Sequence, residues 1–278
     1  MSSKTIHTPD GETLSVREWL LEGTAPRAVV LIVHGLGEHG GRYAHVADWL
    51  NARGFAVRAH DHHGHGRSSG VRGGAPESLR LVHDLALVVD DTRRALPGVP
   101  LVLLGHSLGG LVAASFVARD VRPVDALVLS SPGLDPGLSG VQKGLLAVLS
   151  RLAPTLRVGN GLNPCDISHD VSVVQAYRAD PLNHDRIGSR IAGFLADEGA
   201  KVQAAAPQWR VPTLLLYAGA DRIVRPEGSQ RFADAAAPSR AVTSVAFPAL
   251  FHEIFNESDT APVFAALGDW LDRMLPAR

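Results

Sequence analysis

Three side chains far apart in the sequence have the types of a serine nucleophile, its acid and its base. Ser107 is the central residue of Gly105–Gly110, which contains the pattern G-x-S-x-G. A serine hydroxyl is a weak nucleophile at neutral pH, so it needs a base within hydrogen-bond reach and a third group that orients the base. Asp221 and His252 follow Ser107 in that order. We therefore expect Ser107 to attack an ester carbonyl, with His252 as its base and Asp221 orienting the histidine.

The surroundings of Ser107 are those that a nucleophile turn requires. The apolar run Leu101–Leu104 predicts a strand, and Leu111, Val112 and Ser115 follow with helical spacing. A sharp strand-to-helix turn holds its central residue in a strained conformation and exposes the hydroxyl above the sheet. A plain connecting turn is the alternative, but the strand, the helix and the downstream partners together favour the nucleophile.

The acid and the base each follow another apolar run. The runs Thr213–Tyr217 and Val242–Phe247 precede Asp221 and His252, and ligands of open α/β sheets bind outside the carboxyl ends of such strands. Asp135 is the competing acid, because it follows the preceding run. We favour Asp221. The chain has 13 histidines, most of which we expect to be surface or structural residues. His106, for example, should point away from Ser107.

The negative charge that forms on the carbonyl oxygen needs donors that are already in place. These are usually the backbone N–H after the nucleophile and one from the loop after an earlier strand. The first would be that of Leu108, and the second that of Leu36 in the glycine-containing loop His34–Gly37. Since only the main chain is used, the leucine side chains are free to shape an acyl pocket.

A run of histidines, His60–Gly66, has the closely spaced His and Asp residues of a possible zinc site. It also follows an apolar run, Phe55–Ala59, as a tight glycine turn, so we favour structural hydrogen bonding. The serine mechanism is complete without a metal. The sequence therefore predicts no metal and no organic cofactor.

The elements that must position these residues alternate between strand and helix. The apolar runs are Ala28–Val33, Phe55–Ala59, Leu101–Leu104, Ala126–Leu129, Thr213–Tyr217 and Val242–Phe247. Most are apolar at every position, which is typical of parallel strands covered by helices on both faces. Helical spacing follows in Tyr43–Leu50, Leu81–Leu96 and Val263–Met274. We predict an α/β fold with a central, mostly parallel sheet.

The alternation stops in the middle of the chain. Residues 133–209 lack a strong strand signal, so we expect a cap inserted into a core of residues 1–132 and 210–278. An amphipathic helix is predicted around Leu138–Leu152, and Val171–Tyr177 and Arg186–Leu195 are predicted as two more.

Composition excludes several classes of partner and location. The formal net charge is -1, so there is no positive field to bind nucleic acid. The single cysteine, Cys165, cannot form an internal disulfide, and we expect it to be a packing residue in a reducing compartment. Residues 1–7 do not resemble a signal peptide, and no apolar run approaches the roughly 18 residues of a membrane span. A cytoplasmic protein is expected, with any membrane contact peripheral.

Nearly the whole chain resembles the monoacylglycerol lipase and lysophospholipase branch of the α/β-hydrolases. The motifs that carry this resemblance are His34–His39 with Arg42 and Tyr43, Asp61–Ser68, Gly105–Gly110, Asp180–Leu182 and His252–Glu257. The resemblance implies the same triad and the same two oxyanion donors. It also implies a helical cap with an apolar entrance that touches lipid aggregates, a role that falls on Leu138, Leu145, Leu146 and Leu149.

Several functions remain open. A monoacylglycerol lipase is the first expectation, and a general carboxylesterase or a lysophospholipase with the same triad is the alternative. A dehalogenase or epoxide hydrolase of the same fold would need an aspartate where Ser107 stands. A binding protein that has lost catalysis is a further alternative, since fold and motif do not guarantee turnover.

Overall fold

One central sheet organises the part of the chain that the computed structural model describes, residues 1–276 without the side chains of Lys143 and Ala147. Its strand order is β1-β2-β4-β3-β5-β6-β9-β10. The strands are β1 Ser2–His7, β2 Thr13–Trp19, β3 Val29–Val33, β4 Ala56–His60, β5 Leu101–His106, β6 Ala126–Ser130, β9 Thr213–Ala218 and β10 Val242–Phe247. All neighbours from β4 to β10 pair in parallel, whereas β1 and β2 pair antiparallel with each other and β2 pairs antiparallel with β4.

The predicted α/β class and all six predicted strands are confirmed. The hairpin of β1 and β2 was missed, because its burial alternates along β2 and its apolar residues do not form a continuous run. An antiparallel edge that is half exposed leaves this weaker pattern in a sequence. The strands β3, β5, β6 and β9 are buried at every position, which explains why most of their residues are apolar.

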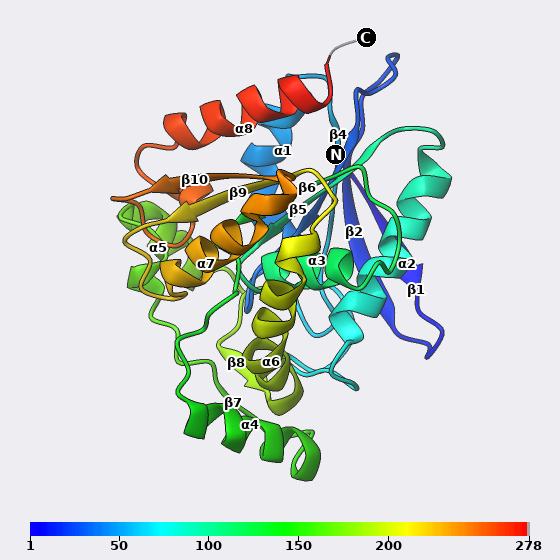
Figure 1. Cartoon of the computed structure of the whole chain (residues 1–278). Coiled ribbons are helices and arrows are strands. Elements are labelled where there is room, and N and C mark those ends of the chain that lie inside the picture. Colours follow the sequence, from blue (N-terminus) through cyan, green and yellow to red (C-terminus); the bar gives the residue numbers. More distant parts are fainter. Residues whose placement is uncertain (277–278) are drawn as a thin grey trace.

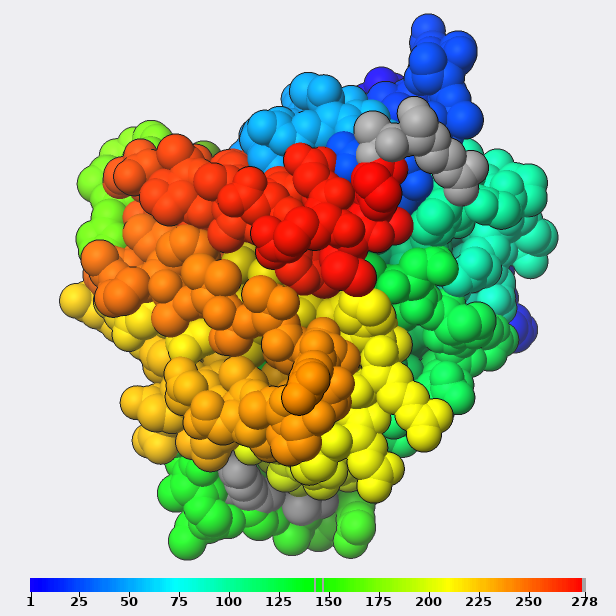
Figure 2. All heavy atoms as spheres, turned by 45° about the horizontal axis from the view of Figure 1, so that its top comes forward, coloured from blue at the N-terminus to red at the C-terminus, as the bar shows by residue number. Residues whose placement is uncertain are grey.

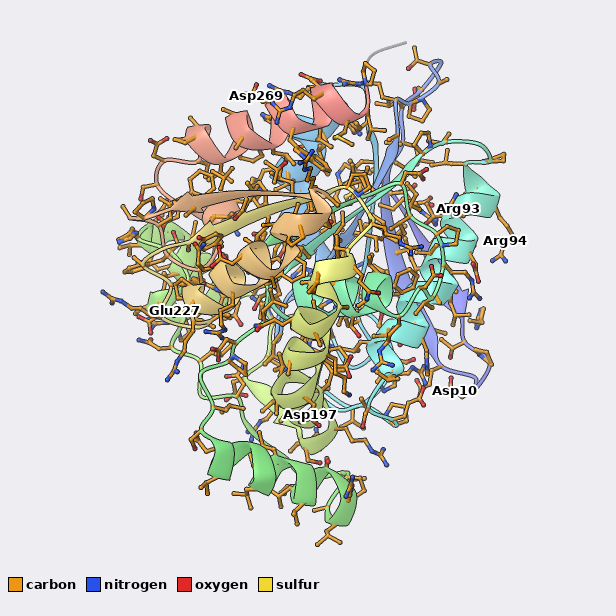
Figure 3. All side chains as sticks on the ribbon, in the orientation of Figure 1. Asp10, Arg93, Arg94, Asp197, Glu227 and Asp269 are labelled. Carbon is orange, nitrogen blue, oxygen red and sulfur yellow. The ribbon has the colours of Figure 1, made fainter. Side chains whose placement is uncertain are left out.

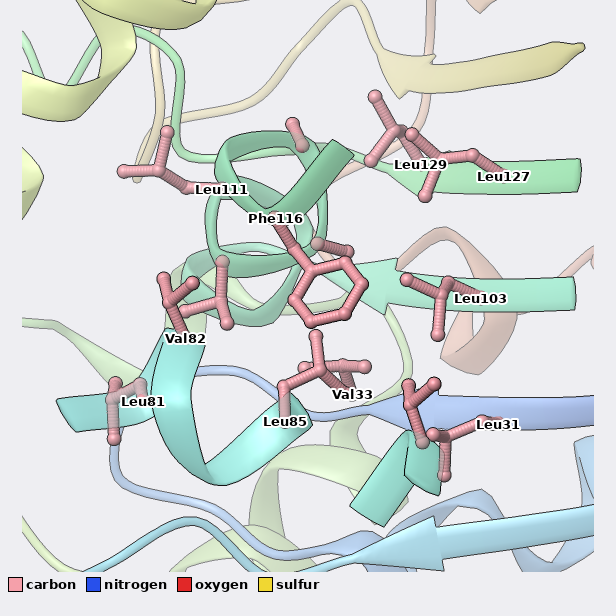
Figure 4. Close-up of a cluster of buried hydrophobic side chains, with 14 of the residues drawn as sticks. Leu31, Val33, Leu81, Val82, Leu85, Leu103, Leu111, Phe116, Leu127 and Leu129 are labelled. Carbon is pink, nitrogen blue, oxygen red and sulfur yellow. The ribbon is translucent and has the colours of Figure 1, made fainter. Parts of the chain in front are cut away.

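Helices cover both faces of the sheet, as Figure 1 shows. Helices α1 Ala44–Asn51 and α8 Ala261–Met274 pack on one face, and α2 Arg80–Ala95, α3 Leu108–Ala118 and α7 Pro226–Ala236 pack on the other. On the second face, Phe116 of α3 lies among leucines and valines of the central strands and of α2 (Figure 4). Each such side chain contributes about 1.5–3 kcal/mol to folding when it is fully buried. These layers hold the strand ends rigidly in place.

Exposed charged residues lie on the outer faces of these helices, whereas the buried ones form ion pairs. Arg93 and Arg94 of α2 and Glu227 of α7 point outward (Figure 3). Arg58 of β4 is instead fully buried, and its Nη2 lies 2.9 Å from Glu18 and 2.8 Å from Asp91. Removing one partner of a buried ion pair costs about 3–5 kcal/mol. The two ion pairs of Arg58 therefore tie β4 to the neighbouring strand β2 and to α2.

The insertion between β6 and β9 contains α4 Gly140–Leu152, β7 Arg157–Gly159, α5 Val171–Ala179, β8 Arg186–Gly188 and α6 Ser189–Ala205. The first two predicted helices are present. The third was placed wrongly, because Arg186–Gly188 pairs antiparallel with β7 and the helix begins only at Ser189. Three residues of backbone pairing are too few to leave a pattern in the sequence.

Some parts of the insertion are anchored to the core and others protrude from it. Glu198 of α6 accepts hydrogen bonds from Ser115 Oγ at 2.7 Å and from Arg119 Nη2 at 2.8 Å, which fixes α6 to α3. Helix α4 lies at the far end of the molecule from α8 and protrudes there (Figures 1 and 2). Within residues 1–276, no helix is both long enough and apolar enough to cross a membrane.

The prediction that Cys165 is a packing residue is wrong. It lies in the 3-10 turn Pro164–Asp166 of the insertion, where it is exposed and its Sγ accepts a hydrogen bond from Arg178 at 3.2 Å. A cysteine between proline and aspartate in a surface turn has no apolar neighbours in sequence to bury it.

Candidate active site

Ser107 occupies the strained turn between β5 and α3. Its backbone has φ 52° and ψ −120°, a region that residues with a side chain rarely adopt. A Cβ atom on Gly105 would lie 2.5 Å from the carbonyl oxygen of Gly109, and one on Gly109 would collide with the carbonyl oxygen of Val33. The glycines of the motif therefore allow strand and helix to approach closely, and the turn presents the serine at the N-terminus of α3.

Asp221 and His252 lie together at the carboxyl ends of β9 and β10. His252 Nδ1 lies 2.7 Å from Asp221 Oδ2, and both side chains are buried. The other carboxylate oxygen accepts the backbone N–H groups of Ile223 at 2.8 Å and Val224 at 3.0 Å, which fixes the aspartate. Since a carboxylate only accepts, the imidazole carries its proton on Nδ1, and Nε2 is left to act as a base.

The charge of Asp221 controls the protonation of His252. Burial alone would lower the pKa of His252, but the adjacent carboxylate more than offsets this, so the pKa is raised above its usual value. Burial would likewise raise the pKa of Asp221, yet the histidine and two backbone donors hold it below its usual range. The aspartate stays ionised and stabilises an imidazolium form of the histidine.

The competing acid and the neighbouring histidine have other partners. Asp135 accepts the N–H of Gly137 at 2.9 Å and pairs with Arg231 at 2.5 Å. His106 Nδ1 lies 3.1 Å from the carbonyl oxygen of Ser130, and its ring centroid is 4.7 Å from that of His252. His252 thus lies beside the residue that precedes Ser107.

Within residues 1–276, no hydrogen bond joins the hydroxyl of Ser107 to His252. Catalytic hydrogen bonds are often long in the absence of substrate and tighten only in the complex, so this geometry is compatible with the predicted pair.

A cavity of about 510 Å³ begins at Ser107 and extends under the insertion. Its lining is mainly apolar and contains Leu36, Ser107, Leu108, Gly133, Pro136, Leu138, Gln142, Leu146, Val158, Gly159, Asn160, Leu162, Ile187, Ala192, Leu195, Ile223 and Val224. Of the four predicted cap leucines, Leu138 and Leu146 line this cavity. Leu145 and Leu149 are not among the described residues that line the cavity. Leu145 is 57% exposed, because it lies on the outer side of α4.

The loop that carries Leu36 approaches Ser107 closely. A Cβ atom on Gly35 would lie 3.3 Å from the Cβ of Ser107, and Leu36 and Leu108 both line the cavity beside the serine. Leu108 is the first residue of α3, where N–H groups have no partner inside the helix and the helix dipole is positive. Leu36 and Leu108 therefore lie beside Ser107, as the prediction of the two oxyanion donors requires.

A buried network that the sequence reasoning missed supports this loop. Glu38 accepts the N–H of Gly35 at 2.6 Å and the hydroxyl of Tyr43 at 2.7 Å. Arg42 lies 2.6 Å from Glu38 and makes two bonds of 2.7 Å to Glu253, the residue after His252. The network connects the loop of Leu36 to the loop of His252. Its residues were visible only as parts of two sequence motifs.

The histidine run forms a buried cluster of tilted and edge-to-face rings beneath the same loop. His34 accepts the N–H of His62 on Nε2 at 2.9 Å, so its Nδ1 donates to the carbonyl oxygen of Gly35 at 2.8 Å. Ring centroids lie 4.3 Å apart for His34 and His62 and 4.9 Å apart for His60 and His62, and the ring of His65 lies 4.5 Å from that of His184 in the insertion. Within residues 1–276, no group of three or more His, Cys, Asp and Glu side chains is arranged to hold a metal ion.

Comparison with known proteins identifies the family of this fold and site. The model of the family described as serine aminopeptidase, S33, matches residues 24–259. The chain belongs to this family. A monoacylglycerol lipase of Mycolicibacterium smegmatis is 36% identical over 251 residues, which are 89% of each chain. The crystal structure of Paleococcus ferrophilus monoacylglycerol lipase superposes with a TM-score of 0.84 at 34% identity, and covers 94% of this chain and 99% of that one.

These matches confirm the predicted α/β-hydrolase fold, the monoacylglycerol lipase branch and a serine ester hydrolase. An uncharacterized abhydrolase domain-containing protein of Dictyostelium discoideum is 34% identical over 97% of this chain. The serine hydrolase chain spans only 29% of the length of that relative.

The ion pair of Asp221 and His252 predicts the pH dependence of the reaction. The base must be neutral, so kcat/KM should rise with pH through a midpoint above 6.5, the usual pKa of histidine. In Asp221→Asn, we expect kcat to fall by about 10³–10⁴-fold and the midpoint to move to lower pH, because the carboxylate charge and the correct tautomer are lost. Steady-state rates between pH 5 and 9 measure both effects. Asp135→Asn is the matched control, and an equal loss in it would contradict the assignment.

The clustered histidines predict acid sensitivity of the fold. Burial lowers the pKa of His60 and of His184 to about 4, with Arg58 adding to the first shift and Arg72 to the second. The unfolded chain therefore binds protons near pH 6.5 that the folded chain does not, so stability is lost as the pH falls from 6.5 towards 4. The loss is about 1.4 kcal/mol per pKa unit for each histidine.

Urea unfolding at pH 7 and pH 5 measures this loss. His60→Phe removes one buried titrating ring and should reduce the difference between the two pH values, whereas a substitution of the half-exposed His83 by Gln should not. If His60→Phe keeps the full wild-type difference, His60 is not a source of the acid sensitivity.

Proposed function

We propose that this serine hydrolase is a monoacylglycerol lipase, which releases a fatty acid and glycerol from single-chain esters. The observation that carries the proposal is the apolar cavity of about 510 Å³ that begins at Ser107 and lies under the insertion. A cavity of this size and lining suits one acyl chain, and ligand sites commonly measure 300–1,000 Å³. The names of the similar lipases from Mycolicibacterium smegmatis and Paleococcus ferrophilus support the same substrate class.

The proposed mechanism has two acyl-transfer steps. His252 removes the proton of the Ser107 hydroxyl as the oxygen attacks the ester carbonyl, while Asp221 stabilises the resulting imidazolium. The backbone N–H groups of Leu36 and Leu108 bind the developing oxyanion. His252 then gives the proton to glycerol as the ester bond breaks.

In the second step, water loses a proton to His252 and attacks the carbonyl carbon of the acyl-enzyme. The bond to Ser107 Oγ then breaks, His252 returns the proton to that oxygen, and the fatty acid leaves. Every proton in this scheme passes through one histidine. The mechanism therefore needs no cofactor. Residues 133–209 would act as a cap that keeps bulk water from the acyl chain, with Leu138 and Leu146 facing the chain.

A substrate panel tests the proposal. Wild type and Ser107→Ala should be compared on 1-monoacylglycerols, p-nitrophenyl esters and lysophospholipids of graded chain length, and on an aminoacyl anilide, because the family description names an aminopeptidase. We expect the greatest kcat/KM on medium and long monoacylglycerols. The serine variant should lose at least about 10⁵-fold in kcat on all esters.

The outcomes separate the alternatives. Activity confined to short p-nitrophenyl esters would indicate a general carboxylesterase, and a preference for lysophospholipids would indicate a lysophospholipase. If a fluorophosphonate does not label Ser107 in folded protein, the chain is a binding protein of this fold.

We further propose a cytoplasmic location with peripheral contact between α4 and lipid surfaces. Four apolar side chains repeat along the outer side of α4 and are strongly exposed, namely Val141 at 84%, Leu145 at 57%, Val148 at 51% and Leu152 at 80%. Exposed apolar patches of this kind mark contact sites, and an amphipathic helix can bury such a face at a lipid boundary. The exposed thiol of Cys165 agrees with a reducing compartment.

Vesicle binding tests this contact. The double variant Val141→Ser, Leu152→Ser should weaken binding to phospholipid vesicles by at least about tenfold, because two apolar side chains no longer enter the lipid. Hydrolysis of a dissolved short ester should stay unchanged. Val171→Ser is the control, because Val171 is 65% exposed but lies on α5. Equal loss in both variants, or no loss in either, would contradict a specific role for α4.

A further inference from the structure

The motif Asp180–Leu182 has no role in the proposed mechanism, although it lies against the loop of Leu36. It ends α5 and begins a turn that extends to His184. The backbone N–H of His184 donates to the carbonyl oxygen of Gly37 at 2.8 Å. The insertion thus holds the carbonyl oxygen of Gly37, the residue directly after Leu36.

The approach of the two segments is so close that it requires a glycine. Gly37 has φ +76°, a conformation that favours glycine, and a Cβ atom there would collide with the carbonyl oxygen of His184. The same Cβ would lie 3.3 Å from the hydroxyl of Tyr177. The loop of Leu36 is therefore enclosed by the insertion, with little room to shift.

Asp180 builds the turn that makes this contact. Its Oδ1 accepts the N–H of Leu182 at 2.8 Å, and its carbonyl oxygen accepts the N–H of Asn183 at 3.1 Å. Pro181 ends the helix because it has no N–H to donate. The side chain of Asn183 in turn donates to the carbonyl oxygen of Tyr177 at 2.9 Å. These bonds fix the direction of the His184 N–H.

The second carboxylate oxygen of Asp180 joins the turn to the core. It lies 2.8 Å from Nε2 of His39, whose side chain is only 7% exposed. His39 Nδ1 accepts the N–H of Gly41 at 3.1 Å, so Nε2 carries the proton and donates to Asp180. One aspartate thus binds its own turn and the end of the loop that carries Leu36.

We propose that Asp180 is a positioning residue for the hydrolysis, which holds the Leu36 N–H in place from the side of the insertion. This inference rests on the proposed function, since it concerns the oxyanion donor of the same site. Glu38 supports the other side of the loop through the N–H of Gly35. An oxyanion donor acts only when it is correctly placed, and a displacement of about 1 Å can cost about 10²-fold in rate.

Asp180→Ala tests the proposal, with Asp185→Ala as the matched control. Asp185 carries the same charge in the same segment, but its side chain is 77% exposed. On p-nitrophenyl butyrate, we expect Asp180→Ala to lower kcat by about 10- to 100-fold with KM changed less than about twofold, because the loss falls on the transition state. The affinity for a trifluoromethyl ketone, which forms an oxyanion on Ser107, should fall by a similar factor. Asp185→Ala should match the wild type.

A second variant covers the case in which Asp180→Ala does not fold. Asp180→Asn keeps the length of the side chain but can satisfy only one of the two partners with its single carbonyl oxygen, so an intermediate loss of kcat is expected. His39→Ala should lower kcat similarly, and the double variant Asp180→Ala, His39→Ala should be little worse than either single variant.

Three results would overturn the inference. These are wild-type kcat in Asp180→Asn, a loss confined to KM, and equal effects of Asp180→Ala and Asp185→Ala. Failure of the proposed function looks different. In that case, the wild type would not react with a fluorophosphonate, or Ser107→Ala would keep its activity, whatever the variants of Asp180 do.

Discussion

The strained backbone of Ser107 is the constraint on which the rest of the site depends. Holding this residue at φ 52° requires a strand and a helix that approach closely enough to exclude a side chain at Gly105 and Gly109. Such strain persists only where the surroundings over-determine it. Here β5 is paired on both sides in a buried parallel sheet, and α3 is packed against it through Phe116. The core therefore holds the serine in place.

Burial and close partners together set the charges of the ionisable side chains around this turn. The ionised Asp221 is buried, which is tolerated because His252 and two backbone N–H groups surround it. The Glu38, Arg42 and Glu253 network places further negative charge near His252 and also raises its pKa. The histidine cluster is the opposite case, because His34 and His62 are kept neutral by burial and use their nitrogens to fix the backbone. The neighbouring residues thus favour a charged His252 and keep the histidines beneath the loop of Leu36 neutral.

Two parts of the insertion are bonded to the core, and a third part faces outward. Helix α6 is bound to α3 through Glu198, and the turn from Asp180 to His184 is bound to the loop of Leu36. Helix α4 differs from these two parts, because its exposed apolar residues face outward, away from the core. A cap that only covered substrate would not need the bonds that join α6 to α3 and the turn to the loop of Leu36. The same segment therefore combines a rigid contact near the chemistry with an exposed apolar surface on α4.

The sequence by itself determined the six parallel strands of the sheet, most helices, the family and the spatial meeting of Asp221 with His252. These follow from local patterns, since buried parallel strands are apolar throughout and the residues at their carboxyl ends converge. Only the tertiary structure decided which cap leucines face the cavity, that β7 and β8 pair, that Cys165 is exposed, and that Asp180 contacts His39. Those features depend on contacts between residues far apart in the chain, and neither hydrophobic period nor turn chemistry encodes such contacts. For the same reason Glu38, Arg42 and Glu253 could all be seen in the motifs, while the ion pairs that join them became evident only once the two loops were brought together.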